Sequence, residues 1–118
     1  MGSSFRAPAG RDDVRTPSEV GHRVKYFALI YDVVDRFGDK RTPHRPAHLQ
    51  LVREALERGD LVMAGALGDP PDGALLVFRA DGAELVERFA QADPYVTSGL
   101  VTRWRVRPWA VVAGGDGR

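Results

Sequence analysis

The most restrictive feature of the sequence is the segment from Val24 to Tyr31, which is apolar, aromatic or β-branched at nearly every position. This composition is typical of a β-strand, in which successive side chains point to opposite faces. One face would carry Val24, Tyr26, Ala28 and Ile30, and the other Phe27, Leu29 and Tyr31. A sheet with one solvated face alternates apolar with polar residues. Both faces of this strand therefore have to be covered.

The later strand-like and helix-like segments follow in an order that predicts the fold. Strands are expected at 61–67, 74–79 and 101–112, helices at 46–58 and from residue 83 onward, and a polar loop at 32–42. The order βαββαβ is that of the ferredoxin-like fold, an α+β class with two helices on one face of a four-stranded antiparallel sheet. A second copy of the sheet is the economical cover for the other face. We therefore expect a homodimer packed through its sheet faces, a dimeric α/β barrel, although three arginines (Arg103, Arg105 and Arg107) would then lie at an edge or line a pocket.

A chain of 118 residues suggests one domain. Residues 1–23 are rich in Gly, Ser, Pro and Arg and are expected to form a flexible arm, 24–113 the domain, and 114–118 a flexible tail. The formal net charge of +1 gives no indication of a nucleic-acid partner. The sequence has no cysteine, no membrane-length apolar run and no apolar core of a signal peptide. We expect a soluble cytoplasmic protein.

His48 is the first candidate for chemistry. A helix is expected over residues 46–58, with Thr42-Pro43 as its cap and first residue and Gly59 as its stop. In this helix His48 falls near the centre of an apolar stripe. The stripe consists of Ala47, Leu49, Leu51, Val52, Ala55 and Leu56. A buried imidazole is either a core residue bonded to backbone groups or a general acid or base, because imidazole titrates nearest to neutral pH.

Asp93 is the second candidate, since it falls on the inward face of the second helix, seven residues after Val86. Asp93-Pro94 is also a typical N-cap followed by proline in the first turn of a short helix over 95–98. One carboxylate can do both, with one oxygen capping and the other orienting an imidazole. A His48–Asp93 pair would suit proton abstraction, isomerisation or elimination.

Three further residues are candidates for substrate binding. Arg45 suits an anion, although it can also be a solvated charge or form a surface pair with Glu54 or Asp60. Gly65 is isolated within a strand, which indicates a bulge or a close backbone approach. Tyr95 could bring a phenol to the same pocket or simply fill the core.

A metal site at His44 and His48 is the weakest of the candidate sites. Their i, i+4 spacing matches helices that bind zinc, but the glutamate of the His-Glu-x-x-His motif is absent and an arginine lies between them. We therefore expect no metal and no cofactor.

Several segments, taken in order, resemble the YCII-related domain family. They are Lys25–Tyr31, Arg45–Leu49, Gly59–Gly65 and Ala92–Tyr95, with Gly99 shortly after, and the likeness spans about Val24 to Val112. The resemblance implies a ferredoxin-like dimeric α/β barrel, a pocket in which His48 and Asp93 match a proposed His/Asp pair, and kinship with muconolactone isomerase-like enzymes. One branch of the family dehydrochlorinates a chlorinated hydroxyquinol. The N-terminal arm and the loop at 32–42 depart from the pattern.

The leading functional hypothesis is a cofactor-independent lyase or isomerase acting on a small anionic or phenolic compound. His48 would move the proton, Asp93 would orient or assist His48, and Arg45 and Tyr95 would help to hold the substrate. The alternative is a non-catalytic domain that binds a small molecule or a partner through the same pocket. A metal-dependent oxygenase using His44 and His48 is the third possibility.

Overall fold

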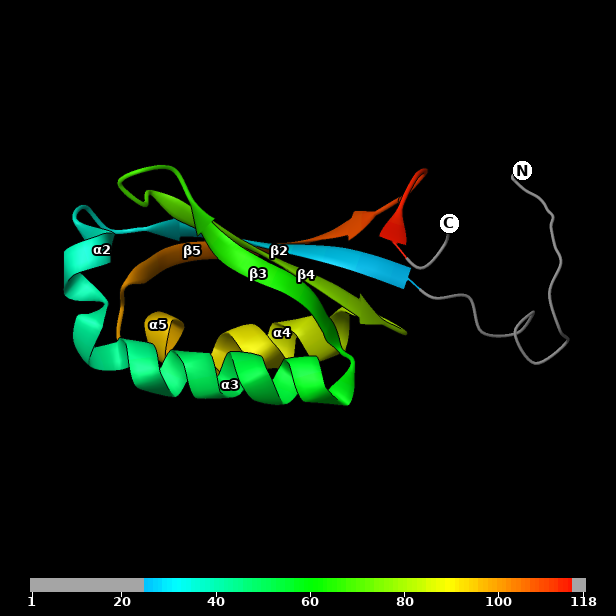
Figure 1. Cartoon of the computed structure of the whole chain (residues 1–118), viewed down its shortest axis with the longest axis horizontal. Helices are drawn as coiled ribbons and strands as arrows, with labels where there is room; N and C mark the ends of the chain where they lie inside the picture. Colours follow the sequence, from blue (N-terminus) through cyan, green and yellow to red (C-terminus); the bar gives the residue numbers. More distant parts are fainter. Residues whose placement is uncertain (1–24, 116–118) are drawn as a thin grey trace, which may run out of the picture.

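The computed structural model describes residues 25–115, so the predicted arm at 1–23 and the end of the predicted tail at 116–118 lie outside the described residues. Four strands and five short or long helices make up the described chain (Figure 1). In order they are β2 (Lys25–Val33), α2 (Phe37–Lys40), η1 (Thr42–His44), α3 (Arg45–Arg58), β3 (Leu61–Leu67), β4 (Gly73–Ala80), α4 (Ala83–Ala92), α5 (Pro94–Thr97) and β5 (Val101–Trp109).

The four strands form one antiparallel sheet in the order β3-β4-β2-β5. Helices α3 and α4 lie side by side under one face of it, and none of the elements within residues 25–115 covers the other face (Figure 1). This arrangement confirms the predicted ferredoxin-like α+β fold. None of the helices in the same part of the chain is long and apolar enough to cross a membrane.

Strand β2 divides its side chains between the two faces as the alternation predicts. Phe27, Leu29 and Tyr31 are buried in the core against the helices. Ala28 and Ile30 point to the uncovered face, where they are partly buried. The cross-strand partners of Ala28 and Ile30 on β4 and β5 share that face.

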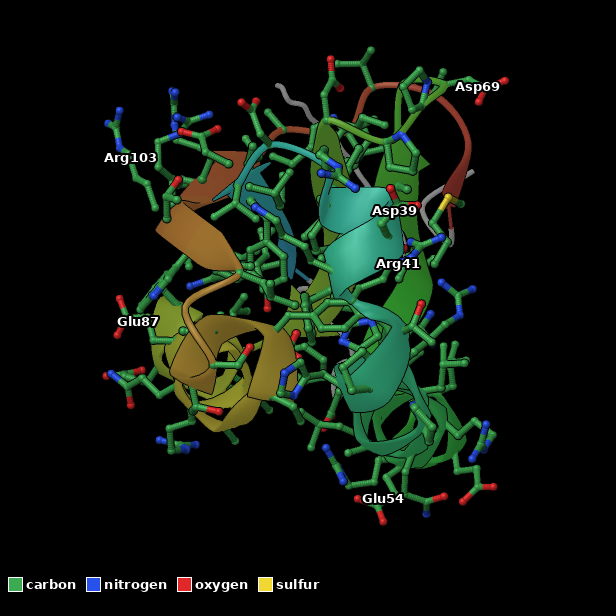
Figure 2. The ribbon with its side chains drawn as sticks, turned by 90° about the vertical axis from the view of Figure 1, so that its left-hand side faces the viewer. Asp39, Arg41, Glu54, Asp69, Glu87 and Arg103 are labelled. Atoms are coloured by element: carbon green, nitrogen blue, oxygen red, sulfur yellow. The ribbon has the colours of Figure 1, made fainter. Side chains whose placement is uncertain are left out.

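The uncovered face is apolar over three strands and basic at one edge. Its apolar part is formed by Ala28, Ile30, Met63, Gly65, Leu67, Leu75 and Val77. Met63 is 64% exposed. The arginine stripe of Arg103, Arg105 and Arg107 lies on β5, an outermost strand, where Figure 2 shows Arg103 at the edge. The prediction that these arginines sit at an edge is confirmed.

The prediction of a polar loop at residues 32–42 is wrong for most of this segment. Strand β2 continues to Val33, and α2 and η1 follow it. The reason is Phe37, which is 1% exposed and fixes α2 to the core. Thr42 does not cap the next helix with its side chain, because η1 precedes α3 and α3 begins at Arg45.

Helix α3 buries a narrower stripe than the sequence predicts. Val52 and Ala55 are buried, whereas Ala47 is exposed and Leu56 is 46% exposed. The sheet is narrow, so only the side of α3 that faces it is covered (Figure 1). Gly59 ends the helix as predicted, with φ 85 and backbone hydrogen bonds typical of a left-handed C-cap.

Smaller differences concern the strand ends. The last strand stops at Trp109 rather than at residue 112, and β4 extends one residue beyond the predicted range on each side. The second helix begins at Ala83 as predicted and ends at Ala92, so Asp93 follows it directly.

Candidate active site

A cavity of about 130 Å³ opens between the start of α3 and the strands β3 and β4. Its helical side is formed by Phe37, Arg41, Arg45, His48, Leu49, Val52 and Tyr95, and its sheet side by Ala64, Gly65, Ala66, Ala74 and Leu76. For scale, an engineered apolar cavity of about 150 Å³ binds benzene. The cavity therefore has room for about one six-membered ring.

His48 and Asp93 meet at the wall of this cavity, although 45 positions separate them in the sequence. Nδ1 of His48 lies 2.8 Å from Oδ1 of Asp93. The His48 side chain is 13% exposed and the Asp93 side chain 0% exposed. The pair is thus within hydrogen-bond distance, with its carboxylate fully buried and its imidazole reaching the cavity.

Two more donors complete the shell around the Asp93 carboxylate. The Tyr31 hydroxyl donates to Oδ2 over 2.7 Å, and the backbone N–H of Tyr95 donates to Oδ1 over 3.0 Å. The second bond is the predicted N-cap of α5, with Pro94 in its first turn. A buried carboxylate is costly unless it is hydrogen-bonded, and here both of its oxygens are bonded.

Tyr31 is held as a neutral donor. Burial raises the pKa of the Tyr31 phenol well above its ordinary range, and the neighbouring Asp93 carboxylate raises it further. The proton therefore stays on the tyrosine, which acts as the donor to Asp93.

These bonds select one tautomer of His48. A carboxylate only accepts hydrogen bonds, so in the neutral imidazole Nδ1 carries the proton and Nε2 carries the lone pair. Among residues 25–115, no group bonds to Nε2. An imidazole sealed in the core would have both nitrogens occupied or buried, whereas this one presents an acceptor at the cavity wall.

Tyr95 supports the imidazole from its side. The two rings are stacked with centroids 3.8 Å apart and planes 11° apart. The Phe37 ring in turn packs edge-to-face against the Tyr95 ring, with the two centroids 5.2 Å apart. Helix α2, through Phe37, and helix α5, through Tyr95, therefore support the orientation of His48.

The Tyr95 hydroxyl is buried and has no hydrogen-bond partner within residues 25–115. Burial raises the pKa of this phenol, and the positive charges of Arg45 and Arg41 oppose that shift without cancelling it. The Arg45 guanidinium lies near enough to this hydroxyl that its charge and a weak polar contact both lower the pKa of the phenol, although the contact falls outside the geometry of a hydrogen bond.

Arg45 lines the cavity and is exposed, and in the described part of the chain it pairs with neither Glu54 nor Asp60. Asp60 pairs with Arg58 at 2.9 Å, and Glu54 accepts from Gln50. Arg41, four residues earlier, lines the same cavity and lies over the Phe37 ring at 5.5 Å from its centroid. Figure 2 shows Arg41 beside α2.

Gly65 lines the cavity, but the bulge expected there is absent. The strand register is regular at Gly65, and a Cβ placed on it would meet nothing within 4 Å. The irregularity lies earlier, between Leu61 and Met63, where two residues of β3 oppose one step of β4. No protein backbone approaches Gly65 closely, and an approach of a ligand to it stays a prediction.

Of the residues predicted from the sequence, the structure brings His48, Arg45, Gly65 and Tyr95 to one cavity, with Asp93 directly behind His48. Three residues were missed: Tyr31, Phe37 and Arg41. The signal for Tyr31 was its place on the first strand, on the same face as Phe27 and Leu29. Within residues 25–115, no group of three His, Cys, Asp or Glu side chains is placed to hold a metal ion, so His44 and His48 gain no further ligand there.

Comparison with known proteins gives a family match and a fold match. The profile of the YCII-related domain matches residues 24–110. Protein YciI of Escherichia coli is 30% identical over 96 residues, which cover 74% of this chain and 97% of that protein. Protein YciI of Shigella flexneri gives the same values.

Among solved structures, one similar chain is 5-chloro-2-hydroxyhydroquinone dehydrochlorinase from Burkholderia phenoliruptrix, in complex with 2,5-dihydroxybenzoquinone. It aligns with a TM-score of 0.61 over 72% of this chain and 93% of its own, at 19% sequence identity. At that identity the likeness shows a shared fold.

Proposed function

The chain belongs to the YCII-related domain family, and from this premise and the cavity geometry we propose that it is a cofactor-independent lyase or isomerase of a small ring compound. His48 would transfer the proton, and Asp93 would orient His48. The observation that carries the proposal is the free Nε2 of His48 at the wall of a ring-sized cavity, with Nδ1 bonded to a buried carboxylate.

The proton transfer follows from this tautomer. Nε2 accepts a proton from a carbon or hydroxyl of the bound substrate, and Asp93 stays ionised and stabilises the imidazolium that forms. In an elimination, the electron pair left on the substrate expels an anionic leaving group. In an isomerisation, the same proton returns to a different atom of the substrate.

Arg45, Tyr95 and Gly65 are the proposed substrate contacts. Arg45 offers a positive charge, Tyr95 a buried hydroxyl, and Gly65 an unobstructed stretch of wall. An anionic or phenolic ring suits this combination of charge and size. The ligand in the dehydrochlorinase structure, 2,5-dihydroxybenzoquinone, is a compound of this kind.

The proposal is tested with the full chain, a panel of chlorinated hydroxyquinols and lactones, and His48→Ala. We expect turnover of at least one compound and a loss of about 10²–10⁴-fold in His48→Ala, the usual contribution of a general acid or base. Arg53→Ala is the matched control, because Arg53 is an exposed α3 residue bonded to Gln50.

Two results would count against catalysis. Turnover that is unchanged in His48→Ala would exclude the proposed proton transfer. Binding of 2,5-dihydroxybenzoquinone without turnover of any compound in the panel, with the ligand recovered unaltered, would favour the non-catalytic binding domain.

The proposed assembly is a homodimer through the uncovered sheet face. The exposed apolar side chains of β3, together with Leu75 and Val77 on β4, form a continuous apolar surface with a shallow depression. An exposed apolar edge strand is an aggregation hazard that proteins normally cover. A second copy would bring an equal apolar surface to it.

Sedimentation velocity over a range of concentrations tests the dimer. Met63→Glu puts a charge on the proposed interface and is expected to weaken association by at least about tenfold. Leu56→Glu changes a residue of similar exposure on α3, away from the sheet face, and should leave association unchanged. A wild-type chain that stays monomeric at all concentrations would refute the dimer.

A further inference from the structure

We propose that Arg41, Arg45 and the Tyr95 hydroxyl form a subsite for a carboxylate carried by the ring-shaped ligand, and that Arg41 sets the preference for acids. The inference deepens the proposed function, since it concerns the same cavity, but it requires only binding and no turnover. A carboxylate is the anion whose two oxygens match the planar donors of guanidinium groups.

The first support is the unsatisfied Tyr95 hydroxyl. Tyr95 is 3% exposed, and its hydroxyl oxygen has no partner within residues 25–115. A buried polar group without a partner costs free energy of folding, and such groups are rare in native proteins. Because its pKa is raised, this phenol keeps its proton and can donate it to an anionic oxygen in the cavity.

The second support is that two arginines line the cavity without a carboxylate to neutralise them. Arg41 and Arg45 both line it, and no Asp or Glu does. In the described part of the chain neither the exposed Arg45 nor the partly buried Arg41 makes an ion pair, while Arg36 and Arg58 are paired with Asp39 and Asp60. The nearby Asp93 has both oxygens bonded to other groups.

The third support is the placement of Arg41. Its guanidinium lies over the Phe37 ring, which itself packs against Tyr95. Stacking on an aromatic face holds a guanidinium in place while leaving its N–H edge available. Arg41, Arg45 and Tyr95 all belong to the helical side of the cavity, so the three donors lie along one side of its wall.

Calorimetric titration of the full chain with benzoate and benzamide tests this subsite, because the two probes share a ring and differ in charge. We expect benzoate to bind at least about tenfold more tightly than benzamide, as befits charge-assisted hydrogen bonds. Arg41→Gln should reduce that preference by about tenfold. Arg36→Gln is the matched control, since Arg36 precedes the same α2, does not line the cavity, and should keep the preference.

Tyr95→Phe separates a binding role of the hydroxyl from a structural one. If the hydroxyl serves a ligand, its removal weakens benzoate binding but leaves the unliganded protein as stable as the wild type or more stable. A structural hydroxyl would give a less stable protein instead.

The proposal is overturned if benzoate and benzamide bind equally, if benzoate does not bind in the millimolar range, or if Arg41→Gln leaves the preference intact. Failure of the proposed proton transfer would look different. In that case His48→Ala would leave turnover unchanged, while the preference for benzoate over benzamide would persist.

Discussion

Replacing Tyr31 with Phe removes one oxygen from the core and tests how the buried carboxylate of Asp93 is held. In the described part of the chain, the Tyr31 hydroxyl is the donor to Oδ2 of Asp93, at 2.7 Å. Asp93 is 0% exposed, so water cannot take over that bond without opening the structure. Leaving a buried acceptor unsatisfied costs about 1–3 kcal/mol, and more when it is charged.

We therefore expect Tyr31→Phe to lower the free energy of unfolding by about 2–3 kcal/mol. For a domain of this size each kcal/mol corresponds to about 4–8 °C in Tm, so the melting temperature should fall by roughly 8–24 °C. Urea denaturation followed by circular dichroism, with the slope m compared between variants, measures the first quantity directly.

A double-mutant cycle with Asp93→Ala identifies the cause. Asp93→Ala removes the acceptor, so Tyr31→Phe should cost at least about 1 kcal/mol less in that background than in the wild type. The reasoning is refuted if Tyr31→Phe costs less than about 0.5 kcal/mol, the range of an ordinary surface change. It is equally refuted if the cost is the same in both backgrounds.

Three further predictions concern the rest of the structure. The raised pKa of Tyr31 means that the folded protein holds the phenolic proton more tightly than the unfolded chain; this stabilisation is complete below about pH 10 and is lost above it. The free energy of unfolding should therefore fall as the pH rises above about 10. In Tyr31→Phe this fall should be less steep, by up to about 1.4 kcal/mol per pH unit. Urea titrations at several pH values measure it, and the same pH dependence in both proteins would contradict the prediction. Gly59→Ala, at φ 85, should destabilise by about 1 kcal/mol, whereas Gly65→Ala, with an ordinary φ and nothing within 4 Å, should change urea midpoints little; the reverse order would be inconsistent with the geometry. Phe37→Ala should cost about 3–5 kcal/mol in thermal or urea unfolding and Leu56→Ala less than about 1, and a small effect at Phe37 would mean that α2 is not anchored by that ring.

The parts of the fold that the sequence predicted are those in which local chemistry decides. The alternation along residues 24–31 identified which side chains of β2 share a face, and Gly59 identified the end of α3. Asp93 followed by proline identified the cap of α5. Each of these signals lies within a few neighbouring residues, so no knowledge of tertiary packing is needed to interpret it.

The parts that it missed depend on contacts between distant segments. Helix α2 has four residues, too few for a periodic pattern, and it is stabilised by packing of Phe37 against Tyr95. The sequence predicted that Tyr31 shares a strand face with Phe27 and Leu29, but it predicted neither which face packs on the helices nor the bond to a carboxylate 62 positions away. The cavity forms only when α2, α3, α5 and the edge of the sheet come together, so Arg41 could not be recognised as part of it.

The double use of Asp93 has a consequence for how such a protein could change over evolutionary time. Its carboxylate begins α5 directly after α4 ends, and it also orients His48. Losing His48 would leave Asp93 with two of its three donors, whereas losing Asp93 would remove the cap of α5 and leave the Tyr31 hydroxyl without its acceptor. We therefore expect the histidine to be lost more readily than the aspartate among relatives of this chain. On the proposed function, a relative with Asp but no His at these positions would be a folded protein without the proton transfer.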